Sequence, residues 1–125
     1  MAAFSNETWE ENVRRVFGGA AQTLIDSEHA TWHKNDPSAH QARLERILTH
    51  WPQLLEIMQQ ELPDTQHIHA LMEGAGMPMH PADIGQSDAD AYDALHSSRD
   101  IRDKYLTSSL LWDLGWLNDF PLELN

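Results

Sequence analysis

Three basic residues lie close together near the C-terminal end of the sequence: Arg99, Arg102 and Lys104. Guanidinium groups match phosphate oxygens in pairs, so this cluster is a candidate site for a phosphate-bearing substrate. Asp100 and Asp103 alternate with the basic residues, and ion pairs along one helix face explain the same pattern without a ligand. The spacing favours this structural interpretation, and phosphate binding is the functional alternative.

Histidine is the second residue type that could do chemistry, because the chain has eight of them. His29 and His33 are four residues apart, a spacing that places two imidazoles on the same side of a helix and suits zinc. A carboxylate such as Glu28 or Asp36 could add a ligand, but the spacing indicates no complete ligand set. A solvated helix face explains an isolated pair equally simply. We therefore assign no metal ligand and keep His29 and His33 as candidates in a histidine-rich metal-binding protein.

The sequence predicts no catalytic and no cofactor-binding residue of its own. Its serines lie in helical patterns without a recognisable oxyanion turn, so no hydrolase triad is assigned. The net charge of -12 disfavours nucleic acid and anionic membranes as partners. There is no cysteine, which excludes disulfides and thiolate metal sites, and the cytoplasm is the expected location.

The elements that must position these groups are predicted to be helices. The 125 residues suit one compact domain over residues 1–125, and no run of alternating β-branched residues predicts a strand. The positions of the glycines, prolines and capping residues, which start and end helices, predict an all-α fold of about six to eight helices. The expected signals are a capping box at Thr8 to Glu11, a break at Gly18-Gly19, a start at Asp36-Pro37, a kink or new start at Pro52, a cap at Asp64, one helical turn at Pro81 to Ile84 and a start at Ser87.

The stretch Ser98 to Leu117 is predicted to be a central helix around which the others pack. Its second half is apolar over most of its surface, so we expect neighbouring helices to cover it, whereas the charged first half meets water. Gly115 is a stop signal, and Trp116 beside it is the tryptophan most expected to be exposed. The helices between Pro37 and Gly74 each carry an apolar stripe that we expect to be buried; these stripes are Leu44, Ile47, Leu48 and Trp51, then Leu55 and Met58, then Ile68, Leu71 and Met72.

Several of these segments resemble the C-terminal helical region of the sn-glycerol-1-phosphate dehydrogenases, in the iron-containing alcohol dehydrogenase and dehydroquinate synthase-like superfamily. The segment Ala75 to Gly85 (AGMPMHPADIG), then Ile101 to Tyr105 (IRDKY), then Leu110 to Gly115 (LLWDLG) follow one another as in that family. Trp9 to Gly18 and Leu44 to Pro52 resemble its earlier helices. The resemblance covers residues 8–117, and Leu106 departs from it, since threonine is expected there.

This resemblance implies a stand-alone or truncated dehydroquinate synthase-like helical domain of a metal- and NAD(P)-dependent oxidoreductase, which is inactive without a nucleotide-binding partner. The family's dinucleotide-binding domain and its divalent metal ligands, one aspartate and two histidines, precede the matched region, so Ser27-Glu28-His29 does not correspond to the family's metal helix. The implied partner is a separate dinucleotide-binding chain that supplies NAD(P), with zinc in the complete enzyme. The alternative is a non-catalytic helical interaction module whose exposed apolar surface is covered by a partner or by homodimerisation.

Overall fold

The protein is all-helical over residues 4–119, the part of the chain that the computed structural model describes. Within this range there are seven α-helices and no strand, which confirms the predicted all-α fold of six to eight helices. The α-helices are α1 (Asn6–Phe17), α2 (Ala21–Ser27), α3 (Pro37–Thr49), α4 (Trp51–Glu61), α5 (Thr65–Gly74), α6 (Asp88–Ser97) and α7 (Thr107–Asp113). The shorter pieces are η1 (Gly18–Ala20), η2 (Glu28–Trp32), η3 (Pro81–Ile84) and η4 (Ser98–Asp100), of which η2 is a π-helical turn and the others are 3₁₀.

The first two helices form a hairpin with a sharp break between them. Helix α1 starts three residues earlier than the predicted capping box, because Ser5 is the N-cap and its hydroxyl accepts a hydrogen bond from the amide of Thr8. The predicted break at the glycine pair is confirmed, since Gly18 has a φ of 50° and the chain continues as η1. This φ lies in the left-handed region that only glycine adopts at low cost.

A small apolar core holds this hairpin together. Trp9 and Val13 of α1 pack against Ala21 and Ile25 of α2, and Phe17 and Leu24 cover the edges. Helix α6 lies against α1, where Arg15 donates to both carboxylate oxygens of Asp93, with 2.7 Å between Nη2 and Oδ1. Helix α7 in turn packs on α6 and on α3. The body of the protein is therefore α1, α2, α6 and α7.

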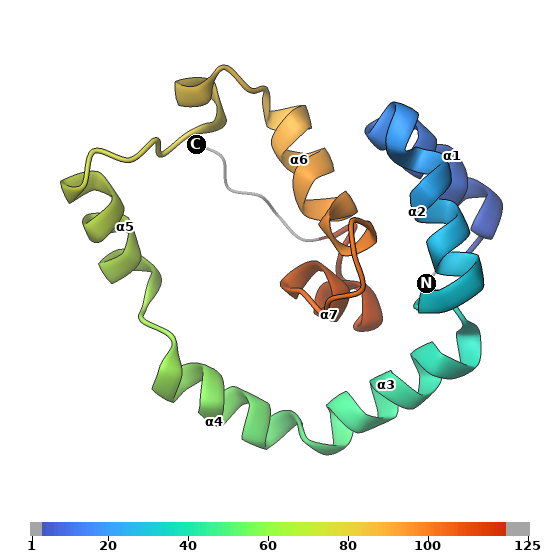
Figure 1. Cartoon of the computed structure of the whole chain (residues 1–125). Helices are drawn as coiled ribbons and strands as arrows, with labels where there is room; N and C mark the ends of the chain where they lie inside the picture. The colour runs from blue at the N-terminus through green and yellow to red at the C-terminus, as the bar shows by residue number, and fades with distance from the viewer. Residues whose placement is uncertain (1–3, 120–125) are drawn as a thin grey trace.

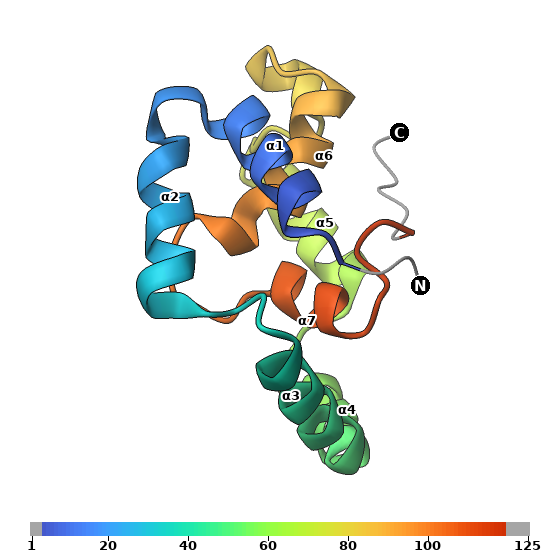
Figure 2. The same ribbon diagram turned by 90° about the vertical axis from the view of Figure 1, so that its right-hand side faces the viewer.

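Three helices leave this body in succession. Figure 1 shows α3, α4 and α5 following one another around an open arc, and Figure 2 shows α3 and α4 extending away from the body. The predicted starts of α3 and α5 are confirmed, and of the two alternatives at Pro52, a kink or a new start, the structure has the new start. Asp36 caps α3 with Pro37 in its first turn, Pro52 lies in the first turn of a new helix, and Asp64 caps α5 through a 2.7 Å hydrogen bond from the amide of His67.

The predicted burial of the apolar stripes on these three helices is wrong. No residue of α3, α4 or α5 is fully buried. The residues of the predicted stripes that are half-buried are Leu44, Ile47, Trp51, Met58 and Met72, and the others are exposed. Residues 48–77, which we call the arm, contain α4 and α5 and expose Leu48, Leu55, Ile57, Leu62, Ile68, Leu71 and Met77. The arm is attached at its base, where Trp51 meets Trp116 edge to face with 6.5 Å between ring centroids. Within residues 4–119, no helix combines the length and the apolar character needed to cross a membrane.

The predicted helix over Ser98 to Leu117 is also wrong, because the chain forms η4, then irregular backbone, and resumes as α7 only at Thr107. The cause is tertiary. Arg99 and Asp100 turn into the body, where they are 4% and 5% exposed, and a straight helix would have left both in water. Trp116 is exposed as predicted, and the left-handed Gly115 follows the end of α7.

Candidate functional site

The structure separates the three residues of the predicted basic cluster. Arg99 is buried: its Nη2 donates to Asn35 Oδ1 at 2.7 Å, and its guanidinium carbon lies 4.2 Å from the centroid of the Trp112 ring. It also pairs with Asp100 at 3.3 Å, so the predicted ion pairing between neighbours is present, but it is buried and not on an exposed helix face. Burial lowers the pKa of Arg99, but an arginine remains charged at neutral pH.

Arg102 and Lys104 are exposed, and only Lys104 reaches the same cavity as Arg99. That cavity has a volume of about 290 Å³ and lies between the loop before α3 and the segment from η4 to α7. Four cationic side chains line it, namely Lys34, Arg43, Arg99 and Lys104. Two carboxylates, Asp103 and Asp113, also lie on its wall, so basic groups outnumber acidic ones in a chain of net charge -12.

We call this hollow the basic cavity, and Lys34 positions one side of it. Its Nζ donates to the carbonyl oxygens of Arg99 at 2.6 Å and Arg102 at 3.3 Å, which holds the irregular backbone after η4 against the loop before α3. The ammonium group also lies 4.5 Å from the centroid of the Trp32 ring. Burial is the main cause that lowers the pKa of Lys34, which indicates that this cation is partly withdrawn from water.

Asp113 organises the other side of the cavity and is only 1% exposed. Arg43 of α3 donates to both of its carboxylate oxygens, at 3.1 Å from Nε and 3.0 Å from Nη2. The hydroxyl of Tyr105 donates to Asp113 Oδ2 at 2.7 Å, and His40 Nε2 lies 3.1 Å from the Asp113 carbonyl oxygen. Burial, and then the hydrogen bond to Asp113, raise the pKa of Tyr105. Asp113 therefore joins α3, α7 and the loop between η4 and α7.

The electrostatics of this cavity favour an anion. Asp113 is already satisfied by Arg43 and Tyr105, and the charge of Arg99 is shared between Asp100 and Asn35. Lys104 makes no side-chain ion pair or hydrogen bond with any residue of the described range 4–119, so its ammonium group is available at the mouth. Trp32 and Trp112 supply aromatic walls.

Sequence reasoning found Arg99 and Lys104 but missed Lys34 and Arg43. These two are more than fifty positions from η4 and carry no local motif. Lys34 meets Arg99 through a direct hydrogen bond to its carbonyl oxygen, and Arg43 reaches the cavity through the packing of α3 on α7.

The two histidines kept as metal candidates do not form a site with the other described residues. Residues 4–119 contain no group of three or more His, Cys, Asp or Glu that could hold a metal ion. The His29 ring nitrogen lies 2.9 Å from Glu10 Oε1, and His33 has a left-handed φ of 50° at the end of the π-helical turn. Glu28 is buried, and its Oε1 accepts a hydrogen bond from the amide of Asn35 at 2.6 Å.

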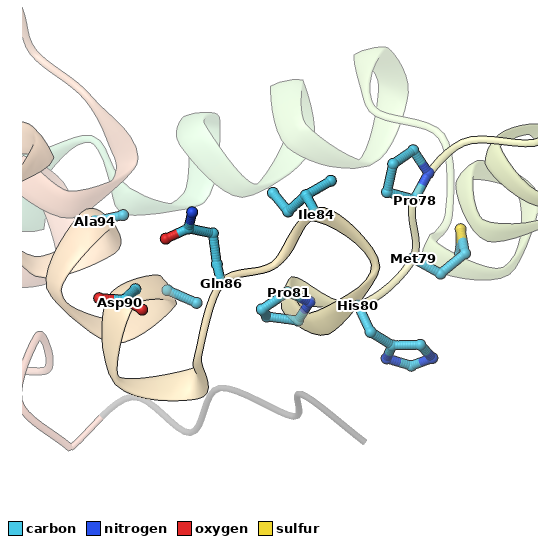
Figure 3. A pocket seen from close by; sticks show the side chains of 9 residues that line it. Pro78, Met79, His80, Pro81, Ile84, Gln86, Asp90 and Ala94 are labelled. Atoms are coloured by element: carbon cyan, nitrogen blue, oxygen red, sulfur yellow. The ribbon is translucent and has the colours of Figure 1, made fainter.

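A second hollow, larger and more open, lies between η3 and α6 and has a volume of about 480 Å³ (Figure 3). Its lining is mostly apolar and includes Pro78, Pro81 and Ile84, with His80 as the one imidazole among the lining residues. The one carboxylate on its wall, Asp90, is used locally, since it accepts from the amide and the hydroxyl of Ser87 at the start of α6. This hollow offers shape and apolar surface, and no charged pair for catalysis.

Comparison of the chain with protein-family models, with curated proteins and with solved structures found no match. The three segments that carry the family resemblance occupy distinct places in the fold. Ala75 to Gly85 runs from the end of α5 through η3 and contributes to the apolar hollow. Ile101 to Tyr105 and Leu110 to Gly115 supply residues of the basic cavity: Asp103, Lys104, Tyr105, Trp112 and Asp113.

Proposed function

We propose that this chain is the helical domain of an sn-glycerol-1-phosphate dehydrogenase-like oxidoreductase and that its basic cavity binds the phosphate group of the substrate. The observation that carries the proposal is the gathering of Lys34, Arg43, Arg99 and Lys104 around one cavity in a strongly acidic chain. The negative charge of the rest of the protein repels anions, so a phosphate ester is attracted chiefly to the cationic side chains of the basic cavity.

The size and chemistry of the basic cavity suit a small polyol phosphate. A volume of about 290 Å³ is close to the lower end, about 300 Å³, of the range found for small-molecule sites. Lys104 offers a point charge at the mouth, while Arg99 and Lys34 add positive potential from partly desolvated positions where charge is less screened by water. Trp32 and Trp112 give the carbon chain an apolar surface to lie against.

Under this proposal the hydride chemistry belongs to another domain. NAD(P) is held by a dinucleotide-binding domain on a partner chain, because that kind of site is built on a parallel sheet and residues 4–119 contain no strand. The described residues also do not fit the family's divalent metal, so no step is assigned to a metal in this chain. The helical domain binds and orients the phosphate end of the substrate.

Phosphate binding can be measured on this chain alone. Titration with sn-glycerol-1-phosphate is expected to change the tryptophan fluorescence saturably, since Trp32 and Trp112 line the cavity. Lys104→Ala should weaken binding about tenfold, equivalent to about 1.4 kcal/mol. Arg46→Ala is the matched control, because Arg46 is exposed on α3 and outside the cavity lining. Equal affinities of the two variants would contradict the assignment.

The catalytic part of the proposal is tested by co-expression with a dinucleotide-binding domain. The complex is expected to reduce NAD(P) when sn-glycerol-1-phosphate is added, and Lys104→Ala should raise the KM for the substrate. If the chain binds the phosphate ester but forms no complex and shows no activity, the anion site stands and the dehydrogenase assignment is refuted.

The exposed arm favours a second candidate function, a non-catalytic interaction module. A helical protein that uses only its own residues for stability rarely leaves two successive helices without one buried residue. In this alternative the basic cavity is a structural ion-pair network, and the titration described above gives no saturable signal.

A further inference from the structure

The arm presents an uncovered apolar surface on two short helices. Ile57 on α4 and Leu71 on α5 are 56% and 59% exposed, and Leu62 between the helices is 64% exposed. Helices of 11 and 10 residues are marginal in water without tertiary packing. Exposed apolar patches on a folded protein mark places where another macromolecule binds, and residues 48–77 leave seven large apolar side chains exposed.

The charges on the arm are all of one sign. No lysine or arginine occurs between Arg46 and Arg99. The ionisable residues of the arm other than histidine are Glu56, Glu61, Asp64 and Glu73, and each of them is exposed. In the body, by contrast, several acidic side chains are paired with arginines, as Glu10 is with Arg14 and Asp93 with Arg15. The carboxylates of the arm lack such cationic neighbours within their own segment.

The negative charge of the arm indicates which kinds of macromolecule can bind to it. Two copies that paired arm to arm would bring acidic residues against acidic residues, which is unfavourable when the charges lose water. Anionic lipid and nucleic acid are disfavoured for the same reason. A protein surface with an apolar centre and a border of lysine and arginine is complementary both to the exposed side chains and to the carboxylates.

We propose that the arm is a docking surface for a protein partner whose binding face is apolar at its centre and basic at its rim. The surface goes beyond the phosphate site, because no residue of the arm lines the basic cavity. The chain that follows the arm forms part of the apolar hollow between η3 and α6, where Pro81 and Ile84 offer a place for a large apolar side chain of the partner (Figure 3). The contact between Trp51 and Trp116 fixes the base of the arm to the body.

Designed peptides test this proposal without knowledge of the natural partner. The probes are a fluorescein-labelled amphipathic helix of leucine and lysine, the same peptide with glutamate in place of lysine, and a scrambled leucine–lysine peptide that has lost its apolar face. Fluorescence anisotropy is expected to show binding of the amphipathic lysine peptide at least about tenfold tighter than that of the scrambled one, because both apolar and charged groups must match. The glutamate peptide should not bind, and added salt should weaken the lysine complex.

Variants locate the binding site. Ile57→Ser combined with Leu71→Ser should weaken the lysine peptide about tenfold, whereas Ile101→Ser should leave its affinity unchanged, since Ile101 is 53% exposed but lies outside the arm. All three positions are exposed, and circular dichroism verifies that the variants keep their helices. Equal binding of the lysine and glutamate peptides, no binding of either, or no effect of the double variant would each overturn the proposal. A dimer in sedimentation velocity that dissociates in the double variant would assign the arm to a second copy and overturn it as well.

Discussion

Replacement of Asp113 by asparagine tests the architecture of the basic cavity most directly. The carboxylate is 1% exposed and receives hydrogen bonds from Arg43 and from the hydroxyl of Tyr105. Asparagine keeps the size of the side chain but removes its charge, and it turns an NH₂ group toward donors. The guanidinium of Arg43 then loses its only anionic partner within the described residues while it remains three-quarters covered, with a 26% exposed side chain.

The cost of Asp113→Asn follows from these contacts. Breaking one partner of a buried ion pair costs about 3–5 kcal/mol, and the partial exposure of Arg43 places this case near about 3 kcal/mol. For a domain of this length, such a loss lowers Tm by roughly 10 °C. Urea denaturation followed by circular dichroism at 222 nm measures the change in the free energy of unfolding, and an unchanged m-value shows that the compactness of both states is preserved.

A double-mutant cycle with Tyr105→Phe makes this test specific. A hydrogen bond to a charged group contributes about 1.5–3 kcal/mol, so Tyr105→Phe should destabilise the natural protein by an amount in the lower part of this range. In the Asp113→Asn background the same change should cost about 1 kcal/mol less, because the charged acceptor is gone. Additive effects, or a loss below about 1 kcal/mol for Asp113→Asn alone, would refute the buried network.

Two further predictions concern a titration and a backbone conformation. Since burial and the bond to Asp113 raise the pKa of Tyr105, absorbance at 295 nm should show one tyrosine that ionises above the ordinary value of about 10, and Tyr105→Phe should abolish that step. The neutral phenol is favoured in the folded state, so its contribution to stability is complete below pH ~10 and is lost as the pH rises through the raised pKa. Gly18→Ala should cost about 1–2 kcal/mol in thermal unfolding because its φ is 50°, whereas Gly19→Ala, whose φ lies outside the left-handed region, should not destabilise.

The helix boundaries that could be predicted are those that depend on a few neighbouring residues. Asp36-Pro37, Asp64 and Ser87 begin helices as expected, and Pro81 to Ile84 forms the single helical turn that its prolines and flanking glycines indicated. A cap is a hydrogen bond between a side chain and an amide two or three positions away, so the sequence alone contains both partners. Ser5 was missed because Thr8 with Glu11 offered a second, equally local signal.

Burial was predicted poorly because it depends on which distant residues pack against a helix, and the spacing of apolar residues along the sequence does not identify them. The stripe on α5 that includes Ile68 and Leu71 has the spacing of a buried face, yet both residues are exposed. Conversely, Arg99 and Asp100 were expected in water and are buried. The guanidinium of Arg99 contacts Asn35, which is distant in sequence, and Trp112, from which it is separated by irregular backbone. The basic cavity was predictable only for the residues near η4. Its remaining cations, Lys34 in the loop before α3 and Arg43 on α3, are brought there by tertiary contacts with the segment from η4 to α7.

The absence of lysine and arginine between Arg46 and Arg99 also determines which reagents can act on this part of the molecule. Trypsin cleaves after lysine and arginine, so it has no target from Ile47 to Ser98, and a complete digest releases α4, α5 and α6 in one fragment. Amine-reactive cross-linkers likewise find no lysine there. The same segment is rich in glutamate and aspartate, so carboxyl-directed coupling and a glutamate-specific protease are the reagents that can mark where a neighbour lies along the arm.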